Sequence, residues 1–199
     1  MNLSETAAIL TAAGRSVRMG TPKALLDWAG KPLIAHQVAA LAGCAQVLVV
    51  LGHEALAVRP FVPTGPRVTV LDNPDFEAGR ASSIALACRF LASSPAPRGV
   101  LLVAVDQPLP PALPRFLMDR VAGDSLAVQP VFEGRCGHPV WIHRSLLPEL
   151  LRLEAHPEGL RSLLQQHRDH LQEVPVPFPE VLLNLNHPED YEAARAACL

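Results

Sequence analysis

The sequence predicts an α/β fold in which helices cover a buried sheet. Short apolar runs rich in valine, leucine and isoleucine alternate with longer helix-like segments, which is the pattern of such a fold. The chain has 199 residues, 49% of them hydrophobic, so it has enough apolar side chains for one substantial core and is short for two. We therefore expect a single domain over residues 1–199.

Four strands and two long helices are expected in the first half of the chain. The expected strands are 7–11, 47–51, 67–71 and 100–105, and the expected helices are 33–41 and 84–91. The run at 100–105 has the continuous apolar character of a strand buried on both faces, and a proline cluster that begins at Pro108 ends it. Segments 95–97 and 174–179 are expected to be surface connectors, because apolar periodicity resumes on both sides of each.

The second half of the chain predicts a hairpin and a final helix. Segment 130–140 has a glycine-bearing turn between two extended runs, which favours a hairpin. Segment 183–191 is expected to lead a short strand into a helix. Pro188 falls near the first turn of that helix, and two acidic residues after it complement the helix dipole.

Net charge and composition limit the kinds of molecule that this chain is expected to bind. The formal net charge is -2, from 17 basic and 19 acidic residues without long runs, so neither a nucleic acid nor an anionic membrane is expected as a partner. The apolar runs are shorter than the roughly 20 residues of a membrane span, and the first residues lack a secretory pattern, so a cytoplasmic location is expected. Scattered cysteines favour reduced structural thiols, and the histidine spacing does not favour a metal site.

The most informative segment is 7–26, which reads AAILTAAGRSVRMGTPKALL. An apolar strand breaks into small residues at Gly14, followed by two arginines, a second glycine and Lys23. Small residues let the backbone approach a ligand, converging N–H groups bind an anion, and the lysine adds a mobile positive charge. A nucleoside triphosphate is the expected ligand. The spacing fits neither the Walker loop nor the dinucleotide fingerprint, and an ordinary strand-to-helix connection with solvated arginines is the alternative.

The same residues resemble the signature of the MobA-like nucleotidyltransferases. The resemblance lies in Gly-Arg-Ser-Val-Arg-Met-Gly at 14–20 and Pro-Lys-Ala-Leu-Leu at 22–26. It implies that the glycine loop wraps a triphosphate and that the lysine contacts the phosphates. Thr-Ala-Ala-Gly at 11–14 is similar to the molybdopterin cytidylyltransferases, whereas guanylyltransferases tend to have Leu-Ala-Gly-Gly. The resemblance assigns these residues of the loop to the nucleotide site: Thr11, Ala12, Ala13, Gly14, Arg15, Ser16, Arg18, Gly20 and Lys23.

A carboxylate follows the expected strand 100–105. Ligands of open α/β sheets gather at the carboxyl ends of strands, so Asp106 is well placed to hold a divalent metal against phosphate oxygens, although an aspartate here also serves as a turn former. In the resembled family an Asp-Gln-Pro at this point holds magnesium, which makes Asp106 the first candidate ligand for Mg²⁺. Asn186 is the second, and its neutral oxygen should bind the metal more weakly than a carboxylate would.

Segment 72–83 lies between an expected strand and an expected helix. It resembles an Asn-Pro-x-Trp-x-x-Gly-Met-x-x-Ser pattern of the cytidylyl branch, which helps to form the nucleotide pocket; a helix cap is the alternative role for its serines. It departs from the pattern at Phe76, where tryptophan is usual, and at Arg80, where methionine is usual. Arg80 adds a charge near the expected site and bears on which acceptor is bound. The implied nucleotide-binding residues are Asp72, Asn73, Gly79, Ser82 and Ser83.

The hairpin 130–140 carries the expected acceptor contacts. It contains Gly-Arg-Cys-Gly-His-Pro, similar to a Gly-Arg-x-Gly-His-Pro element on the acceptor side of the family's cleft. Gly137 and His138 are therefore candidates for contacting a pterin, although a plain structural hairpin is the alternative. Segment 157–164 is similar to a Gly-x-x-x-Leu-Leu element on the same side.

The resemblance spans 7–191 and implies a Rossmann-like, three-layer fold of the nucleotide-diphospho-sugar-transferase type, with a mixed, mainly parallel sheet. It implies that CMP is transferred from CTP to molybdopterin, the molybdenum cofactor, when the acceptor phosphate attacks the α-phosphorus and pyrophosphate leaves. Arg18, Lys23 and Asp106 are the candidate catalytic residues: the first two offset phosphate charge, and Mg²⁺ held by Asp106 and Asn186 bridges the reacting phosphates. Such a reaction needs neither a protein nucleophile nor a general base.

Three alternatives stay open at this point. Asn184 and Asn186 are similar to the guanylyl branch and favour GTP, whereas Thr11 and segment 73–83 favour CTP. A sugar phosphate is another possible acceptor. A chaperone that delivers nucleotide or molybdopterin to a molybdenum hydroxylase without turnover is a function of another class. A catalytic lysine and aspartate argue against such a carrier. For the enzyme, a molybdenum hydroxylase is the expected recipient of the product.

Overall fold

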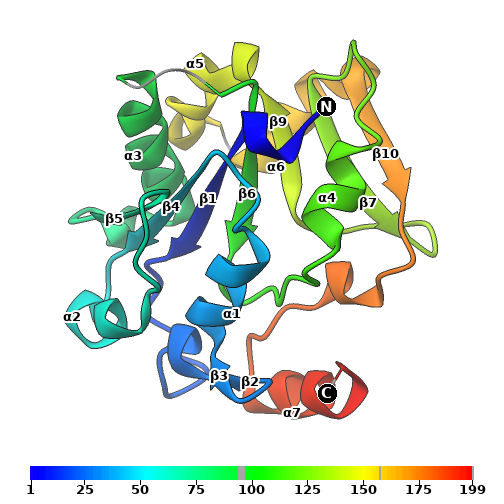
Figure 1. The fold of residues 1–199 in the computed structure, drawn as a ribbon. Helices are drawn as coiled ribbons and strands as arrows, with labels where there is room; N and C mark the ends of the chain where they lie inside the picture. Colours follow the sequence, from blue (N-terminus) through cyan, green and yellow to red (C-terminus); the bar gives the residue numbers. More distant parts are fainter. Residues whose placement is uncertain (94–96, 157, 199) are drawn as a thin grey trace.

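The computed structural model describes residues 1–93, 97–156 and 158–198. Within these ranges, eight strands form one sheet with helices on both faces, giving three layers (Figure 1). The strand order is β5-β4-β1-β6-β9-β7-β10, and the short β8 pairs with β7. The strands of this sheet are β1 Thr6–Ala12, β4 Gln46–Leu51, β5 Val68–Asp72, β6 Gly99–Ala104, β7 Ala127–Phe132, β8 Arg135–Cys136, β9 Val140–His143 and β10 Leu171–Pro175.

The sheet is mixed and mainly parallel, as predicted. Strand β1 pairs in parallel with β4, where Ala7 lies opposite Gln46, and with β6, where Thr6 lies opposite Gly99. Strand β9 runs antiparallel to both of its neighbours, β6 and β7. Because β1, β4, β5 and β6 share one direction, their carboxyl ends meet at the same edge of the sheet, where α/β folds of this kind bind their ligands.

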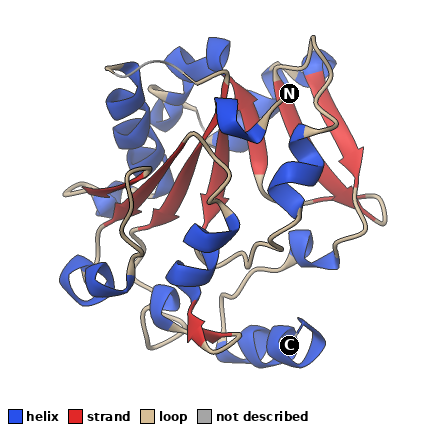
Figure 2. Cartoon of the chain, viewed as in Figure 1, coloured by secondary structure: helices blue, strands red, loops and turns tan. Residues whose placement is uncertain are grey.

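Helices cover the two faces of the sheet in two groups (Figure 2). Ala8 and Leu10 of β1 pack toward α1 and α4, whereas Ala7 and Ile9 pack toward α3, α5 and α6. All seven residues of β1 are buried, which explains its unbroken apolar sequence. The helices are α1 Leu33–Ala40, α2 Ala55–Val58, α3 Arg80–Ala92, α4 Leu113–Met118, α5 Leu147–Leu150, α6 Leu160–Gln166 and α7 Pro188–Cys198. Among the described residues, no helix is both long and apolar enough to cross a membrane.

The predicted hairpin at 130–140 is confirmed, and its turn explains its sequence. Val131 lies opposite Cys136 and Phe132 opposite Arg135, so only two residues connect β7 to β8. These are Glu133 and Gly134, with φ of 48° and 75°. Left-handed backbone at both central positions is typical of the tight turn that matches the twist of paired strands.

Three expectations about secondary structure need correction. Helix α3 begins at Arg80 instead of residue 84, directly after Gly79, which has a φ of 99°. Segment 174–179 is only partly a connector: its first two residues end β10, which pairs in parallel with β7, and Val174 and Val176 are buried. The short strand expected at the start of segment 183–191 is not formed in the described structure. That stretch is held instead by a hydrogen bond from the Leu185 N–H to the Asp106 carbonyl, at 2.8 Å.

The remaining expected strands and the helix α1 lie where they were predicted, within one or two residues. Of the connector expected at 95–97, residues 95 and 96 lie outside the described residues. The pair β2 Asp27–Trp28 and β3 Lys31–Pro32 forms a small separate sheet. It lies beside the C-terminal helix α7 (Figure 1), and the Tyr191 hydroxyl donates to the Asp27 carbonyl at 2.6 Å.

Gln37 of α1 ties a helix to the turn that follows β6. Its side chain is completely buried. The amide nitrogen donates to the carbonyls of Ala104, at 3.1 Å, and Gln107, at 2.8 Å, while its oxygen accepts from the Leu109 N–H at 2.9 Å. These bonds satisfy backbone groups of an irregular buried segment that no sheet ladder satisfies. Gln37 therefore fixes the conformation of the turn that carries Asp106.

Replacing this side chain should cost stability. Gln37→Leu leaves two or more buried backbone groups without partners, so we expect the free energy of unfolding to fall by about 3 kcal/mol. Urea unfolding followed by circular dichroism measures the loss. The matched control, Gln166→Leu at an exposed position of α6, should change the value by less than about 0.5 kcal/mol. Equal effects of the two substitutions would contradict the anchoring role of Gln37.

Candidate active site

A cavity of about 480 Å³ opens at the carboxyl ends of β1 and β6. It is lined by the loop that follows β1, by the start of α3, by the turn after β6 and by the extended segment that precedes α7. Most of the residues predicted for the nucleotide and metal sites meet here. Those that line the cavity are Thr11, Ala12, Ala13, Gly14, Arg15, Ser16, Arg18, Lys23, Gly79, Ser83, Asp106 and Asn186.

The glycine loop folds back on Ser16. The backbone N–H groups of Met19 and Gly20 donate to the Ser16 carbonyl at 2.9 and 3.2 Å, and the Ser16 hydroxyl accepts from the Lys23 N–H at 3.1 Å. Gly20 has a φ of 73°, in the left-handed region that glycine adopts without strain. A glycine at this position therefore allows the turn to form. The bonds to Ser16 place Lys23 at the mouth of the loop.

Gly14 differs from Gly20 because the folded chain itself does not require a glycine there. Its backbone is not left-handed, and a Cβ atom built at this position would meet no heavy atom within 4 Å. The open space beside it belongs to the cavity. A glycine at such a position lets a ligand come close to the backbone.

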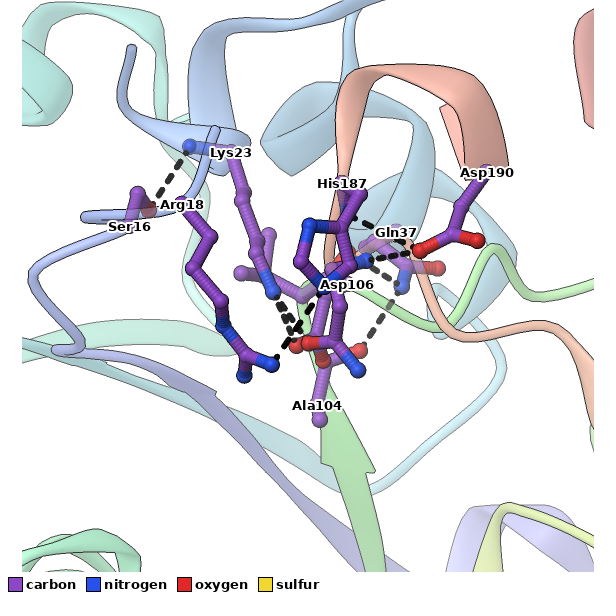
Figure 3. A network of polar contacts seen from close by, with 10 residues as sticks. Ser16, Arg18, Lys23, Gln37, Ala104, Asp106, His187 and Asp190 are labelled. Carbon is purple, nitrogen blue, oxygen red and sulfur yellow. Dashed lines mark hydrogen bonds and ion pairs between the residues drawn. The ribbon is translucent and has the colours of Figure 1, made fainter. Parts of the chain in front are cut away.

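Lys23 joins three segments that are far apart in the sequence (Figure 3). Its Nζ donates to Asp106 Oδ2 and to Asn186 Oδ1, both at 2.8 Å. The side chains of Lys23 and Asp106 are only 12% and 25% exposed, so this ion pair is less screened than a surface pair. The three residues predicted separately for phosphate and metal binding thus form one cluster.

The oxygen donors of this cluster fit a magnesium ion. The Asp106 carboxylate and the Asn186 amide oxygen converge on one positive charge, the Lys23 ammonium, which shows that both oxygens face the same point. Magnesium prefers oxygen ligands and is commonly held by one or two protein groups together with substrate phosphates and water. Among the described residues, no group of three or more His, Cys, Asp or Glu side chains forms a metal cage. Asp106 and Asn186 could therefore supply part of a coordination shell that phosphate oxygens complete.

The segment before α7 contributes a second basic contact. Nη1 of Arg18 lies 3.5 Å from Nε2 of His187 (Figure 3). Asp190 accepts hydrogen bonds from the backbone N–H groups of Asn186, at 3.1 Å, and His187, at 2.9 Å. Asp190 therefore holds the strip of backbone that presents Asn186 to Lys23. From the sequence, an acidic residue here is expected only to complement the helix dipole. Nothing in the sequence pattern indicates that Asp190 also binds the backbone of Asn186 and His187.

Four predicted nucleotide-binding residues do not line the cavity. Gly20 lies in the turn of the loop, and Asp72 forms an exposed ion pair with Arg59 at 2.5 Å. Asn73 and Ser82 are buried and hydrogen-bonded within the protein. The Asn73 amide donates to the hydroxyl oxygens of Ser82, at 2.8 Å, and Ser83, at 3.0 Å. These hydrogen bonds connect the first turn of α3 to the residue that follows β5.

A second cavity, of about 690 Å³, lies beside the first. His138 lines it, whereas Gly137 does not: a Cβ atom at Gly137 would lie 2.4 Å from the Val181 carbonyl oxygen, so this glycine permits close backbone packing. Burial, together with the nearby charge of Arg80, lowers the pKa of His138 to about 4, against a weaker opposing effect of Asp106. His138 is therefore neutral at pH 7. Arg80 lines both cavities and stands between them.

The side wall of the second cavity includes part of the segment predicted for the acceptor. Of segment 157–164, Glu158, Leu160, Arg161 and Leu164 line it, and Pro157 lies outside the described residues. Arg161 pairs with Glu158 at 3.7 Å. Hairpin 130–140 supplies the opposite wall through Cys136, His138 and Val140.

This chain is similar in sequence to nucleotidyltransferases of molybdenum cofactor metabolism. It is 24% identical over 194 residues to the molybdenum cofactor cytidylyltransferase of Escherichia coli, covering 97% of both proteins. It is 31% identical over 206 residues to a probable molybdenum cofactor guanylyltransferase of Trichormus variabilis, covering 94% of this chain and 89% of that protein.

The fold of this chain is also similar to that of solved structures. The crystal structure of Rv0371c from Mycobacterium tuberculosis is 28% identical and superimposes with a TM-score of 0.81, covering 98% of this chain and 99% of that one. A second structure of Rv0371c, in complex with manganese, has a TM-score of 0.77 at 27% identity over the same shares of the two chains. Residues 8–174 match the MobA-like NTP transferase domain. The Rossmann-like nucleotidyltransferase fold and the match over most of its length show that this chain belongs to the MobA-like NTP transferase family.

Proposed function

We propose that the chain, acting as a single domain over residues 1–199, transfers CMP from CTP to molybdopterin and releases pyrophosphate. The observation that carries the proposal is the cluster of Lys23, Asp106 and Asn186 at the mouth of the glycine loop. A mobile cation and two oxygen ligands at one point suit a bound triphosphate and its metal ion. The similarity to molybdenum cofactor nucleotidyltransferases supports the same class of reaction.

The residues of the first cavity would bind and neutralise the triphosphate. Backbone N–H groups near Gly14 are accessible to phosphate oxygens because no side chain covers that backbone. Lys23 and Arg18 would offset the charge that builds up on the leaving pyrophosphate. Asp106 and Asn186 would hold Mg²⁺, which supplies further charge neutralisation at the reacting phosphates.

The second cavity would bind the acceptor. An acceptor phosphate is already nucleophilic at neutral pH, so the chain needs only to place it in line with the α-phosphorus. His138 is neutral there and offers a hydrogen bond without a charge. The product, a cytosine dinucleotide of molybdopterin, would pass to a molybdenum hydroxylase in the cytoplasm.

Transfer of GMP from GTP is the second candidate function. Asn184 and Asn186 both line the first cavity, and asparagine at these positions is similar to the guanylyl branch. Thr11 at the end of β1 and the segment around Asn73 favour CTP instead. The cytidylyltransferase and guanylyltransferase relatives are 24% and 31% identical to this chain. Sequence identity therefore does not decide between CTP and GTP. CTP is preferred here because the glycine loop, which contacts the nucleotide directly, has the cytidylyl sequence.

The proposal is tested by nucleotide binding. With magnesium present, calorimetry should show that CTP binds more tightly than GTP, ATP or UTP. Lys23→Ala should weaken CTP binding by roughly 10- to 100-fold, because it removes a charge-assisted contact to the phosphates, whereas Lys31→Ala on the exposed β3 should leave it unchanged. GTP selectivity would favour the guanylyl function, and no nucleotide binding at all would overturn the proposal.

Turnover separates the enzyme from a carrier of the cofactor. Asp106→Ala should abolish magnesium-dependent release of pyrophosphate from CTP and molybdopterin, because the main metal ligand is gone. If this variant kept all measurable function, the chaperone would become the better description.

Substitution of Gly14 should separate binding from folding. Gly14→Ala introduces a methyl group into open cavity space without backbone strain, so the free energy of unfolding should change by less than about 1 kcal/mol. CTP affinity should fall by roughly tenfold, because the methyl group keeps the phosphates away from the backbone. Gly99→Ala is the opposite control: its Cβ would lie 2.3 Å from the Trp141 ring, so it should lower stability. A loss of stability in Gly14→Ala as large as in Gly99→Ala would contradict the assignment.

His138 should make the protein less stable in mild acid. Its pKa of about 4 in the folded chain lies below its ordinary value of 6.5, so between these pH values the unfolded chain binds a proton that the folded chain does not. Stability is therefore lost as the pH falls from 7 toward 4. Between pH 7 and pH 5 the wild type should lose about 2 kcal/mol more than His138→Gln. Urea unfolding at both pH values measures this, with the exposed His170→Gln as control; equal losses in wild type and His138→Gln would refute it.

A further inference from the structure

Arg80 occupies the boundary between the two cavities. It is the first residue of α3 and lines the nucleotide cavity together with Asp106. It also lines the second cavity together with His138. It is therefore the residue at which a molecule in one cavity would meet a molecule in the other. Where the cytidylyl signature usually has methionine, this chain has a cation at that junction.

The guanidinium of Arg80 has no partner within the described part of the chain. No hydrogen bond or ion pair joins it to another described residue, and the Asp106 carboxylate that faces the same cavity is bonded to Lys23 at 2.8 Å. Arg80 is exposed and faces two openings. Desolvation lowers the pKa of Arg80, whereas the nearby Asp106 carboxylate favours its charged form and raises the pKa by less, and an arginine stays charged. Because that carboxylate is hydrogen-bonded to Lys23, the N–H groups of the guanidinium remain available to an anionic ligand.

The start of α3 adds positive potential at the same place. The helix has 13 residues, and no side chain in the described structure caps its first turn. Its first N–H groups and its dipole therefore point toward the junction without a protein acceptor. Together with the unpartnered guanidinium, they form a site for an anion.

The rest of the second cavity is suited to the body of a larger molecule. Its walls combine aliphatic side chains, among them Ile84, Val140 and Leu164, with polar and charged ones; Arg161 is paired with Glu158, and Arg168 and Glu173 also line the cavity. A ring-shaped molecule with both apolar and polar groups could lie in it, with one anionic end at Arg80. A phosphate at that end would be directed toward the nucleotide cavity.

We propose that Arg80 binds the phosphate of the acceptor and makes the enzyme selective for acceptors that carry a phosphate monoester. The inference rests on the proposed function. In the transfer, an oxygen of the acceptor phosphate forms a bond to the α-phosphorus, the bond from that phosphorus to the bridging oxygen breaks, and pyrophosphate leaves with the electron pair. Arg80 takes no proton in this step. It holds the attacking phosphate and reduces its repulsion from the nucleotide.

The test uses inorganic phosphate as the probe, on protein saturated with magnesium and the unreactive α,β-methylene analogue of CTP. Calorimetry should show saturable phosphate binding that Arg80→Met weakens by roughly 10- to 100-fold and Arg80→Lys by less, since lysine keeps the charge but not the two-pronged contact. Arg89→Met, an exposed arginine on the same helix, should bind phosphate as the wild type does. With molybdopterin, Arg80→Met should raise the KM for the acceptor and leave the KM for the nucleotide within about twofold.

The outcomes separate this inference from the function on which it rests. Phosphate binding that is equal in Arg80→Met and wild type would overturn the inference and leave the transferase proposal standing. The same follows if Arg80→Met weakens binding of the nucleotide analogue as much as that of phosphate, because Arg80 would then belong to the nucleotide site. Failure of the wild type to bind any nucleotide would overturn both. If Arg80→Met does not fold, the smaller loss in Arg80→Lys is the deciding result, and phosphate binding unchanged in that variant would refute the two-pronged contact.

Discussion

The cluster around Lys23 is the interaction on which the geometry of the site depends. Its two hydrogen bonds connect residues that are 83 and 163 positions apart in the sequence. Lys23 begins a short 3-10 helix, whereas Asp106 and Asn186 lie on segments without regular structure, so each segment must be held separately. The Ser16 hydroxyl holds the backbone of Lys23, Gln37 holds the turn that carries Asp106, and Asp190 holds the backbone of Asn186. The polar contacts that place these three residues come from the glycine loop, from α1 and from α7.

The same cluster also compensates for the charge of a partly buried carboxylate, that of Asp106. A carboxylate that is only 25% exposed loses hydration, and its charge is costly unless a partner compensates for it. The Lys23 ammonium compensates for Asp106 and also satisfies the Asn186 oxygen. The protein can therefore keep the two oxygens that we propose as metal ligands close together, because a cation of its own already lies between them.

Much of this arrangement could be predicted from the sequence, and the exceptions have physical reasons. Gly14 and Asp106 each lie two residues after an apolar strand, so local pattern alone places them at one sheet edge, and Lys23 follows on the loop that leaves β1. Gln37 could not be assigned, because a glutamine within an apolar helix shows only that it needs partners, and those partners come from a turn about 70 residues away. The last two residues of β10 were predicted as part of a connector because prolines interrupt the apolar pattern there. An edge strand tolerates proline because one side of it makes no ladder bonds.

Asn73 and Ser82 belong to the predicted nucleotide-binding motif, yet neither lines the first cavity. Both were predicted to bind nucleotide, and the structure instead buries them in contact with each other beneath the start of α3. That helix start is where the two cavities meet and where Arg80 projects. The buried amide and hydroxyls therefore stabilise the position of a charge at the junction, and through that charge a motif beside the first cavity would act on the proposed acceptor phosphate.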